Sequence, residues 1–278
     1  MKSIIIKSPA KINLGLRILN KREDGYHNIH TLFYPLYDLY DEITFVKSNR
    51  YSLISNLPAE IIDKTNLITQ AKVLLENFTQ EKLNCTITLN KRIPIGAGLG
   101  GGSSNAAATL LALNELFELN INYEALKKIS LQLGSDVPFF LKAKPALGTS
   151  RGEELEMVDV EIPFPILLVN PNIHISTKFA FSKIQPSSKL LDYTNLNTGS
   201  KEIFISMQKT LVNDFENLIF NEYVEIKNIH DKLISCGAIF CKMSGTGATV
   251  FGIFETLKEA EAAKNKFPTD YFTFISNN

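Results

Sequence analysis

The sequence has little that would direct it to a membrane, to nucleic acid or to an acidic surface. Its 29 basic and 29 acidic residues cancel, so it lacks the positive excess with which proteins bind nucleic acid or anionic lipid. No apolar run approaches the ~18 residues of a membrane-spanning helix. The apolar start at residues 4–6 is too short for a signal peptide. We therefore expect a cytoplasmic protein with neither a nucleic-acid nor a membrane partner.

Cysteine is also scarce, and its three positions lack the spacing of metal ligands. Cys85, Cys236 and Cys241 are expected to be reduced thiols in the core. The apolar and charged fractions, 45% and 21%, are those of an ordinary globular protein, and 278 residues leave room for two domains. The Pro-Phe-Pro sequence at residues 163–165 is typical of a linker, so we expect domains at 1–158 and 159–278.

The most informative stretch is a glycine-rich segment that runs from Pro94 to Asn105, with five glycines in seven positions. Glycine tolerates positive φ and allows a backbone to approach a ligand closely. Ser103, Ser104 and Asn105 are good helix caps, and residues 106–119 have the apolar spacing of a helix. Because the N-terminus of a helix attracts anions, we expect this loop to hold phosphate, with Gly101 at a position of positive φ that a larger residue would block.

The loop fits neither common nucleotide motif. No lysine follows Gly102, so the Walker pattern is absent. The spacing Gly96-x-Gly98-x-x-Gly101 matches the dinucleotide fingerprint, but a helix follows where that fold needs a strand that ends in an acidic residue. A flexible linker is a further alternative, and the amphipathic helix that follows directly argues against it.

Three other polar groups are candidates for a site. Lys11 and Asn13 share one face of an alternating strand at residues 10–19, which is either a site or a solvated edge. Tyr26 and His27 follow an Asp-Gly turn, where they could stack on a planar ring or lie on the surface. Asp136 lies between Gly134 and a proline, and is either a carboxylate held by a cation or a helix cap.

Hydrophobic periodicity predicts an α+β protein. We expect strands at residues 4–7 (ending at Ser8-Pro9), 10–19, 29–36, 41–46, 85–89, 166–169, 238–243, 249–254 and 272–275. Helices are expected at residues 66–78, 106–119, 123–133, 179–184, 203–213, 223–235 and 257–267.

Five segments appear together and in a characteristic order: residues 9–14 (Pro-Ala-Lys-Ile-Asn-Leu), 24–27 (Asp-Gly-Tyr-His), the glycine-rich loop, 134–139 (Gly-Ser-Asp-Val-Pro-Phe) and 244–248 (Ser-Gly-Thr-Gly-Ala). In this combination the whole chain resembles the GHMP kinase superfamily, which includes galactokinase and the homoserine, mevalonate and phosphomevalonate kinases. The first two segments resemble in particular the branch that phosphorylates the 2-hydroxyl of a cytidylyl sugar-alcohol diphosphate in non-mevalonate isoprenoid synthesis.

The resemblance implies a fold and a set of site residues. The fold would be an α+β two-domain GHMP kinase, with an N-terminal domain like ribosomal protein S5 domain 2 and a ferredoxin-like C-terminal domain. Lys11 and Asp136 would be the catalytic pair. The ATP phosphate loop would comprise Pro94, Ile95, Gly96, Ala97, Gly98, Leu99, Gly100, Gly101, Gly102, Ser103 and Ser104, with Asn66 in the adenine pocket. Substrate would bind Asn13, Tyr26, His27, Thr177 and Phe181, with the aromatic rings enclosing the cytosine.

The resemblance also implies ATP and Mg²⁺ as cofactors, without identifying the protein ligands of the metal. Asp136 would accept the hydroxyl proton, while Lys11 would keep Asp136 ionised and offset charge on the phosphoryl group. One departure is visible: Ser150-Arg151-Gly152-Glu153 stands where the family has Gly-Arg-Gly-Glu, which leaves the shape of this loop open. A kinase of another small alcohol and a non-catalytic nucleotide-binding protein are the alternatives.

Overall fold

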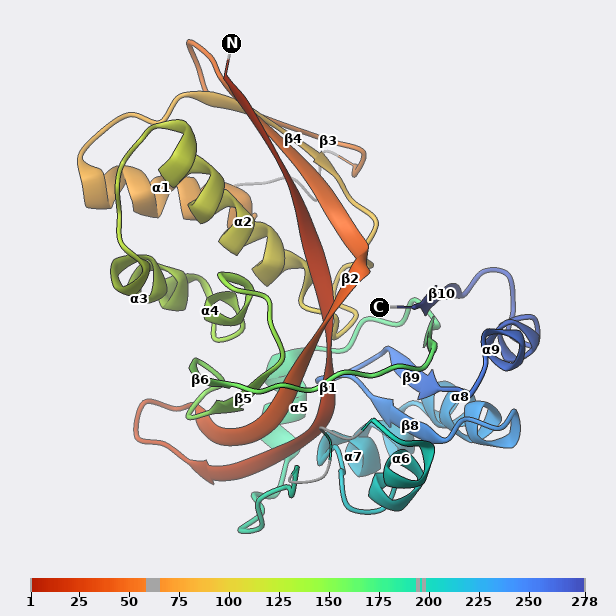
Figure 1. The fold of residues 1–278 in the computed structure, drawn as a ribbon. Coiled ribbons are helices and arrows are strands. Elements are labelled where there is room, and N and C mark those ends of the chain that lie inside the picture. Colours follow the sequence, from red (N-terminus) through yellow and green to blue (C-terminus); the bar gives the residue numbers. More distant parts are fainter. Residues whose placement is uncertain (1, 59–65, 194–195, 197–198, 278) are drawn as a thin grey trace. The chain divides into compact units, whose positions relative to one another are not determined.

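The computed structural model describes residues 2–58, 66–193, 196 and 199–277, which form two compact units (Figure 1). Unit 1 draws on residues 1–10, 39–95 and 100–143, and unit 2 on residues 11–38, 96–99 and 144–278. Both units are discontinuous in sequence because the two longest strands and the glycine-rich loop pass from one unit to the other. The domain boundary at residues 158–159 stays a prediction.

Two long strands begin the fold, β1 (Ser3–Lys21) and β2 (His27–Lys47). The predicted break at Ser8-Pro9 is wrong, and so is the predicted gap at residues 37–40. β1 pairs with β2 and lies off the main path of the sheet. Proline is tolerated on such an edge strand, because its missing N–H removes no ladder bond there.

The first sheet has the order β3-β4-β2-β5-β6, with β1 added to β2. In unit 1, β3 (Ser52–Ser55) runs parallel to β4 (Cys85–Asn90), and β4 pairs antiparallel with the end of β2. In unit 2, β5 (Ala146–Thr149) pairs with the beginning of β2 and with β6 (Glu154–Met157). The sequence did not predict β3, β5 or β6, because four-residue strands offer too little alternation to read.

Four helices of unit 1 pack against one another on one side of its strands (Figure 1). They are α1 (Leu67–Thr79), α2 (Gly101–Leu116), α3 (Tyr123–Leu133) and α4 (Val137–Phe140). α2 is the central one, and its buried residues include Ala106, Ala107 and Ala108. These small side chains allow close packing of α1 against α2.

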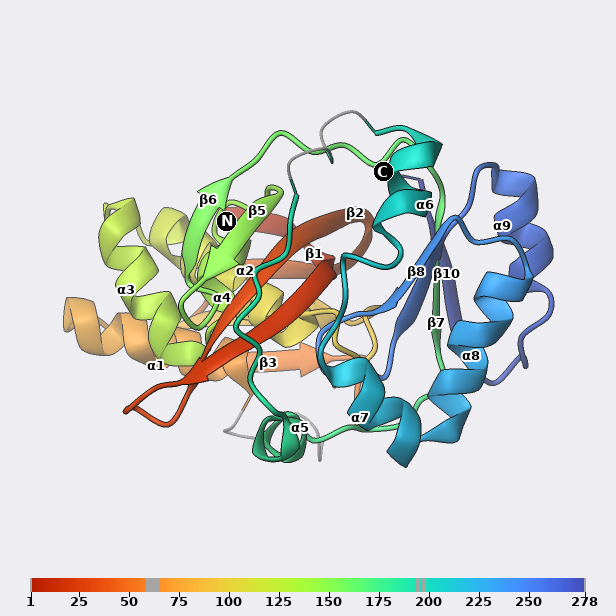
Figure 2. The ribbon, with the colours of Figure 1, turned by 90° about the horizontal axis from the view of Figure 1, so that it is seen from below.

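Unit 2 contains an antiparallel sheet with the order β10-β7-β9-β8. Its strands are β7 (Ile166–Asn170), β8 (Phe240–Met243), β9 (Val250–Ile253) and β10 (Phe272–Ser276). Figure 2 shows α8 (Val224–Ser235) and α9 (Leu257–Lys264) along one face of this sheet, where they cover a core that includes Val169, Leu233 and Val250. This helix-on-sheet layering is the α+β arrangement that the sequence predicted.

Further helices in the described part of unit 2 are α5 (Thr177–Lys183), α6 (Lys201–Met207) and α7 (Phe215–Glu222). The sequence predicted one helix at residues 203–213, but α6 ends at Met207 and α7, which it did not predict, begins at Phe215. None of the helices in the described part of the chain has both the length and the apolar composition of a membrane span.

Candidate nucleotide and substrate site

The glycine-rich loop uses its glycines for specific backbone conformations. Gly96, Gly98 and Gly100 have φ of 66°, 77° and 71°, in the left-handed region that glycine favours. A Cβ on Gly98 would lie 2.2 Å from the carbonyl oxygen of Ser244. Gly98 is therefore fixed both by its φ and by the close approach of the second glycine turn at residues 244–247.

Helix α2 begins five residues earlier than the sequence predicted, at Gly101. Its N-cap is Gly100, which offers no side-chain hydrogen bond, so the expectation that Ser103, Ser104 or Asn105 caps the helix is wrong. Helices begin with N–H groups that have no partner within the helix. Since no side chain caps them here, the N-terminus of α2 is suited to an anion.

Gly101 has no positive φ, which corrects the expectation for this residue. It is buried in the first turn of α2, and an added Cβ would lie 2.8 Å from Lys91 Nζ and 2.9 Å from Ile93 Cγ2. Gly101 is therefore needed for packing against the segment that leads into the loop. Gly102 differs: it is exposed, and its Cβ would make only an ordinary 3.5 Å contact with Leu67.

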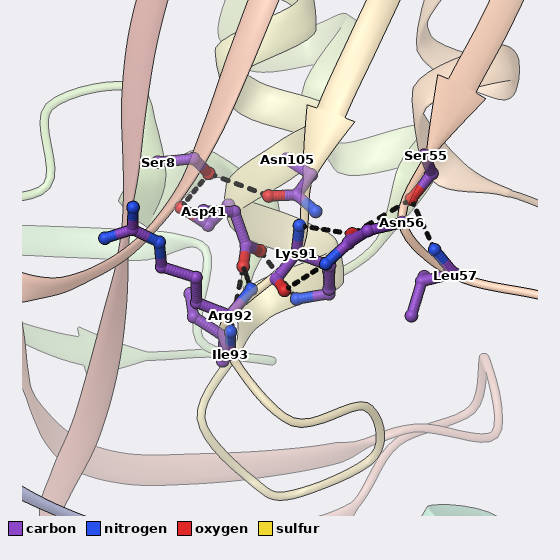
Figure 3. A network of polar contacts seen from close by, with 10 residues as sticks. Ser8, Asp41, Ser55, Asn56, Leu57, Lys91, Arg92, Ile93 and Asn105 are labelled. Carbon is purple, nitrogen blue, oxygen red and sulfur yellow. Dashed lines mark hydrogen bonds and ion pairs between the residues drawn. The ribbon is translucent and has the colours of Figure 1, made fainter.

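A buried network fixes the segment before the loop (Figure 3). The Asp41 carboxylate, fully buried, accepts from Lys91 Nζ at 2.6 Å, from Arg92 N at 2.7 Å and from Ile93 N at 2.9 Å. The Asn56 amide pairs with the backbone N–H and C=O of Lys91. Burial lowers the pKa of Lys91, and the charge of Asp41 opposes that shift. Asp41 thus holds the backbone in place just before Pro94.

The first turn of α2 is anchored from the other side by Ser8 of β1 (Figure 3). The Ser8 hydroxyl lies 2.7 Å from Ser104 Oγ and 3.0 Å from Asn105 Oδ1, and all three side chains are buried. Ser104 therefore contributes to packing within unit 1, whereas Ser103 is half-buried.

Lys11 and Asn13 form a buried pair beside the loop in unit 2. Lys11 Nζ donates to Asn13 Oδ1 at 2.6 Å and to the Gly98 carbonyl at 3.0 Å. Asn13 donates in turn to Thr31 Oγ1 at 2.9 Å. Lys11 and Asn13 are only 3% and 2% exposed, so the alternative of a solvated strand face is wrong. A buried ammonium that is bonded to the glycine-rich loop favours a negatively charged ligand nearby.

The second glycine turn holds the first one in place. Ser244 Oγ donates to the Gly98 carbonyl at 2.9 Å, and Thr249 N donates to Ala97 O at 3.3 Å. Asn213, which is buried, braces this turn by donating to the carbonyls of Met243 and Gly245 at 2.7 and 2.8 Å. The backbone of residues 97–98 is thus held by unit 2 at several points.

Asp136 lies at the N-cap position of α4, but its side chain makes no capping hydrogen bond. The capping alternative therefore explains its position and not its carboxylate. Asp136 is half-buried, and α4 packs against α2, the helix that begins in the glycine-rich loop. Asp136 belongs to unit 1 and Lys11 to unit 2, and their catalytic pairing stays a prediction.

Asn66 is the N-cap of α1, where its Oδ1 accepts from Ile68 N at 2.9 Å. This contact gives Asn66 a structural role in addition to its predicted place in the adenine pocket. Thr177 begins α5, and its hydroxyl lies 3.4 Å from that of Thr246 in the second glycine turn.

Each of the predicted aromatic residues Tyr26, His27 and Phe181 contacts another side chain. The Tyr26 ring is covered on one face by the Arg151 guanidinium, whose Cζ is 3.9 Å from the ring centroid. The rings of His27 and Phe181 are 5.5 Å apart and tilted by 33°. A base between two rings needs about 7–8 Å, twice the ~3.5–4.0 Å contact distance of carbon atoms. His27 and Phe181 must therefore separate before a cytosine can lie between them.

Comparison with known proteins decides the family. The family model described as "GHMP kinases N terminal domain" matches residues 66–144, and the model described as "GHMP kinases C terminal" matches residues 194–272. A 4-diphosphocytidyl-2-C-methyl-D-erythritol kinase from Chlorobium phaeobacteroides (strain BS1) is 40% identical over 96% of this chain and 94% of its own length. The chain belongs to the 4-diphosphocytidyl-2-C-methyl-D-erythritol kinase family of GHMP kinases.

Other relatives agree with this assignment. The kinase of the same name from Chlorobaculum tepidum is 37% identical over 96% of each chain. The crystal structure of a 4-(cytidine 5'-diphospho)-2C-methyl-D-erythritol kinase matches with a TM-score of 0.82 and 30% identity, covering 98% of both chains. A homoserine kinase from Cytophaga hutchinsonii shares the fold, with a TM-score of 0.70 at 17% identity. The predicted two-domain α+β GHMP kinase fold is thereby confirmed.

The residues present are compatible with Mg²⁺. The described residues contain no cluster of three His, Cys, Asp or Glu side chains that could hold a metal ion. Mg²⁺ in kinases is bound by one or two protein groups together with the phosphates of the nucleotide, so such a cluster is not required. Asp136 and the Ser103 hydroxyl, both half-buried in unit 1, are donors of the suitable kind.

The residues that the sequence did not predict are those that hold the glycine-rich loop in place, not those that are expected to contact ligands. The pattern of residues 41–46 marks Asp41 only as the start of a strand, because the groups that bind its buried carboxylate lie far away in the sequence. Asn213 was placed at the end of a helix for the same reason. The alternation of β2, in which Leu39, Asp41 and Ile43 share one buried face, was the available signal for Asp41.

Proposed function

We propose that this chain is an ATP-dependent kinase that phosphorylates the 2-hydroxyl of 4-diphosphocytidyl-2-C-methyl-D-erythritol in the non-mevalonate isoprenoid pathway. The observation that carries the kinase part is the buried Lys11 ammonium, which donates to the Gly98 carbonyl of the glycine-rich loop. A protein that only binds nucleotide does not need a buried charge at that place. The substrate part is supported by the relatives' names and by Tyr26-His27.

The chemistry assigns one task to each group. The uncapped N–H groups of α2 and the glycines of the loop bind the ATP phosphates. Asp136 accepts the proton of the attacking hydroxyl, and Lys11 offsets the negative charge that develops on the phosphoryl group. Phosphoryl transfer depends on such positioning and charge stabilisation more than on covalent assistance. Mg²⁺, when bound, neutralises charge on the β- and γ-phosphates.

Asn13, Tyr26, His27, Thr177 and Phe181 form the proposed substrate side. Burial, and to a lesser degree the charge of Lys21, lower the pKa of His27, which favours the neutral imidazole at neutral pH. A neutral imidazole both donates and accepts a hydrogen bond, as the edge of a cytosine requires. Because the proposed reaction uses ATP and a small charged substrate, we propose that the enzyme acts in the cytoplasm.

The test is an ATP-consumption assay on the purified protein with a panel of alcohols. We expect turnover with the cytidylyl substrate and none above background with mevalonate or homoserine. Phosphorus NMR of the product should place the new phosphate on the 2-oxygen. Turnover of another alcohol alone would favour a different GHMP kinase activity. Nucleotide binding without turnover of any alcohol would favour a non-catalytic protein.

A further inference from the structure

The Ser150 side chain connects two turns of the chain, and Ser150 itself lies in the second of them. One is the turn at residues 22–26, which ends with Tyr26, and the other is the turn at residues 149–153, which carries Arg151. Both belong to unit 2.

The Ser150 hydroxyl bridges two charged side chains. It accepts from Arg22 Nη1 at 2.7 Å and donates to Glu153 Oε1 at 3.0 Å. Glu153 is only 7% exposed, and its second oxygen accepts from the backbone N–H of Arg151 at 2.7 Å. A glycine at position 150 could keep the backbone bond from Ile29 N to the residue-150 carbonyl, but it could not form this bridge.

Arg22 continues the connection into the first turn. Its guanidinium also contacts Asp24 at 3.0 Å and Asn28 at 3.1 Å. Asp24 in turn accepts from Tyr26 N at 3.1 Å, and Arg22 N donates to the Tyr26 carbonyl at 2.8 Å. The backbone of Tyr26 is therefore held from both sides by residues joined to Ser150.

The two turns that the bridge connects also contact each other directly, because the Arg151 guanidinium covers one face of the Tyr26 ring at 3.9 Å. Tyr26 is nevertheless 50% exposed, so much of the residue stays accessible to a ligand. Ser150 itself has a φ of 59°, a left-handed conformation that costs a residue other than glycine some free energy. A strained serine that completes a charged bridge suggests that the hydroxyl contributes enough to offset the strain.

We propose that Ser150 is a positioning residue for the cytidylyl substrate. Through Arg22 and Glu153, Ser150 holds the Tyr26 ring against Arg151, so that the cytosine stacks on the face of the ring that Arg151 does not cover. This inference rests on the proposed function.

The test measures steady-state kinetics of Ser150→Ala and Ser150→Gly, with each substrate varied in turn. Both variants lose the hydroxyl, and only glycine relieves the left-handed strain. We expect both to raise the KM of the cytidylyl substrate roughly 3- to 10-fold, the usual effect of one lost hydrogen bond, with kcat and the KM of ATP unchanged. Ser150→Asn should recover most of the affinity, because asparagine tolerates positive φ and supplies both a donor and an acceptor.

Ser235→Ala is the matched control, since it removes an exposed hydroxyl that bonds only the Lys232 carbonyl in the last turn of α8. An unchanged KM in both Ser150 variants would overturn the proposal. A defect in Ser150→Ala that Ser150→Gly does not share would assign the effect to backbone strain and would also overturn it. A fall in kcat with a parallel change in the KM of ATP would indicate a general structural role. Failure of the wild-type protein to use the cytidylyl substrate would instead refute the proposed function.

Discussion

At the scale of single residues, the polar groups predicted for the site differ in burial. Lys11 and Asn13 are almost fully buried and bonded to each other, while Asp136 is half-buried and makes no capping bond. A buried lysine needs negative or polar partners, so Lys11 is part of the packing of unit 2 as well as of the proposed chemistry. The alternation of residues 10–19 predicted that Lys11 and Asn13 share a face, but it could not tell whether that face is buried.

The Asp136 carboxylate can be tested by Asp136→Asn, which keeps the shape of the side chain and removes its basicity. We expect turnover to fall by roughly 10²- to 10⁴-fold, the usual contribution of a positioned base, with ATP affinity retained. Calorimetric titration with ATP and an ATP-consumption assay measure the two quantities. Near-normal turnover would remove Asp136 from the mechanism.

The pairing of Lys11 with Asp136 is tested by a double variant. Lys11→Met keeps the length of the side chain in its buried position and should also lower turnover strongly. If the two groups act as a unit, the double variant Lys11→Met/Asp136→Asn loses less activity than the product of the two single losses. Fully multiplicative losses would show that the two residues act independently.

The Asp41–Lys91 pair is tested by Asp41→Asn, which leaves the buried Lys91 ammonium without its carboxylate. We expect a loss of about 3–5 kcal/mol in the free energy of unfolding, as for other broken buried ion pairs. Urea denaturation measures this loss. Asp231→Asn, which breaks an exposed pair with Lys227, is the control and should cost about 0–1 kcal/mol. Equal losses in the two variants would refute a special role for Asp41.

At the scale of elements, the glycine-rich loop and α2 form one continuous feature, because the helix begins inside the glycine-rich stretch. The sequence located this feature but placed the helix start at residue 106 rather than Gly101. Serine and asparagine are better caps than glycine by propensity, so local preference pointed to the wrong position. The left-handed φ of Gly100 and the packing of Gly101 on Lys91 decide the start instead.

Gly102→Ala separates phosphate binding from packing, because Gly102 is exposed and an added methyl meets only an ordinary contact. Alanine in a helix should raise the free energy of unfolding by up to about 1 kcal/mol. If phosphate approaches the first turn of α2 closely, the same methyl should weaken ATP binding about tenfold or more. Thermal unfolding and calorimetry give the two values, and unchanged ATP affinity would exclude this turn as the phosphate cradle.

At the scale of the whole molecule, the order of motifs along the chain predicted the fold and the family correctly. The division into two discontinuous compact units was beyond prediction, because it depends on long-range contacts of β1 and β2. Short strands such as β5 and β6 were missed for a similar reason, since the pairing of β5 with β2 and of β6 with β5, rather than a local pattern, defines them. The arrangement of the aromatic rings was also unpredictable, as the direct contact of His27 with Phe181 illustrates.

The central claim is that the chain recognises a cytidylyl substrate at a place other than its ATP site. The most direct measurement is calorimetric titration of CDP into protein whose ATP site is filled with a non-hydrolysable ATP analogue. We predict binding that Phe181→Ala weakens roughly 5- to 150-fold, since stacking on an aromatic face contributes about 1–3 kcal/mol per base. Phe78→Ala, which removes an exposed ring from α1 in unit 1, should leave CDP affinity unchanged. Absence of any CDP binding to the analogue-filled protein would contradict the account.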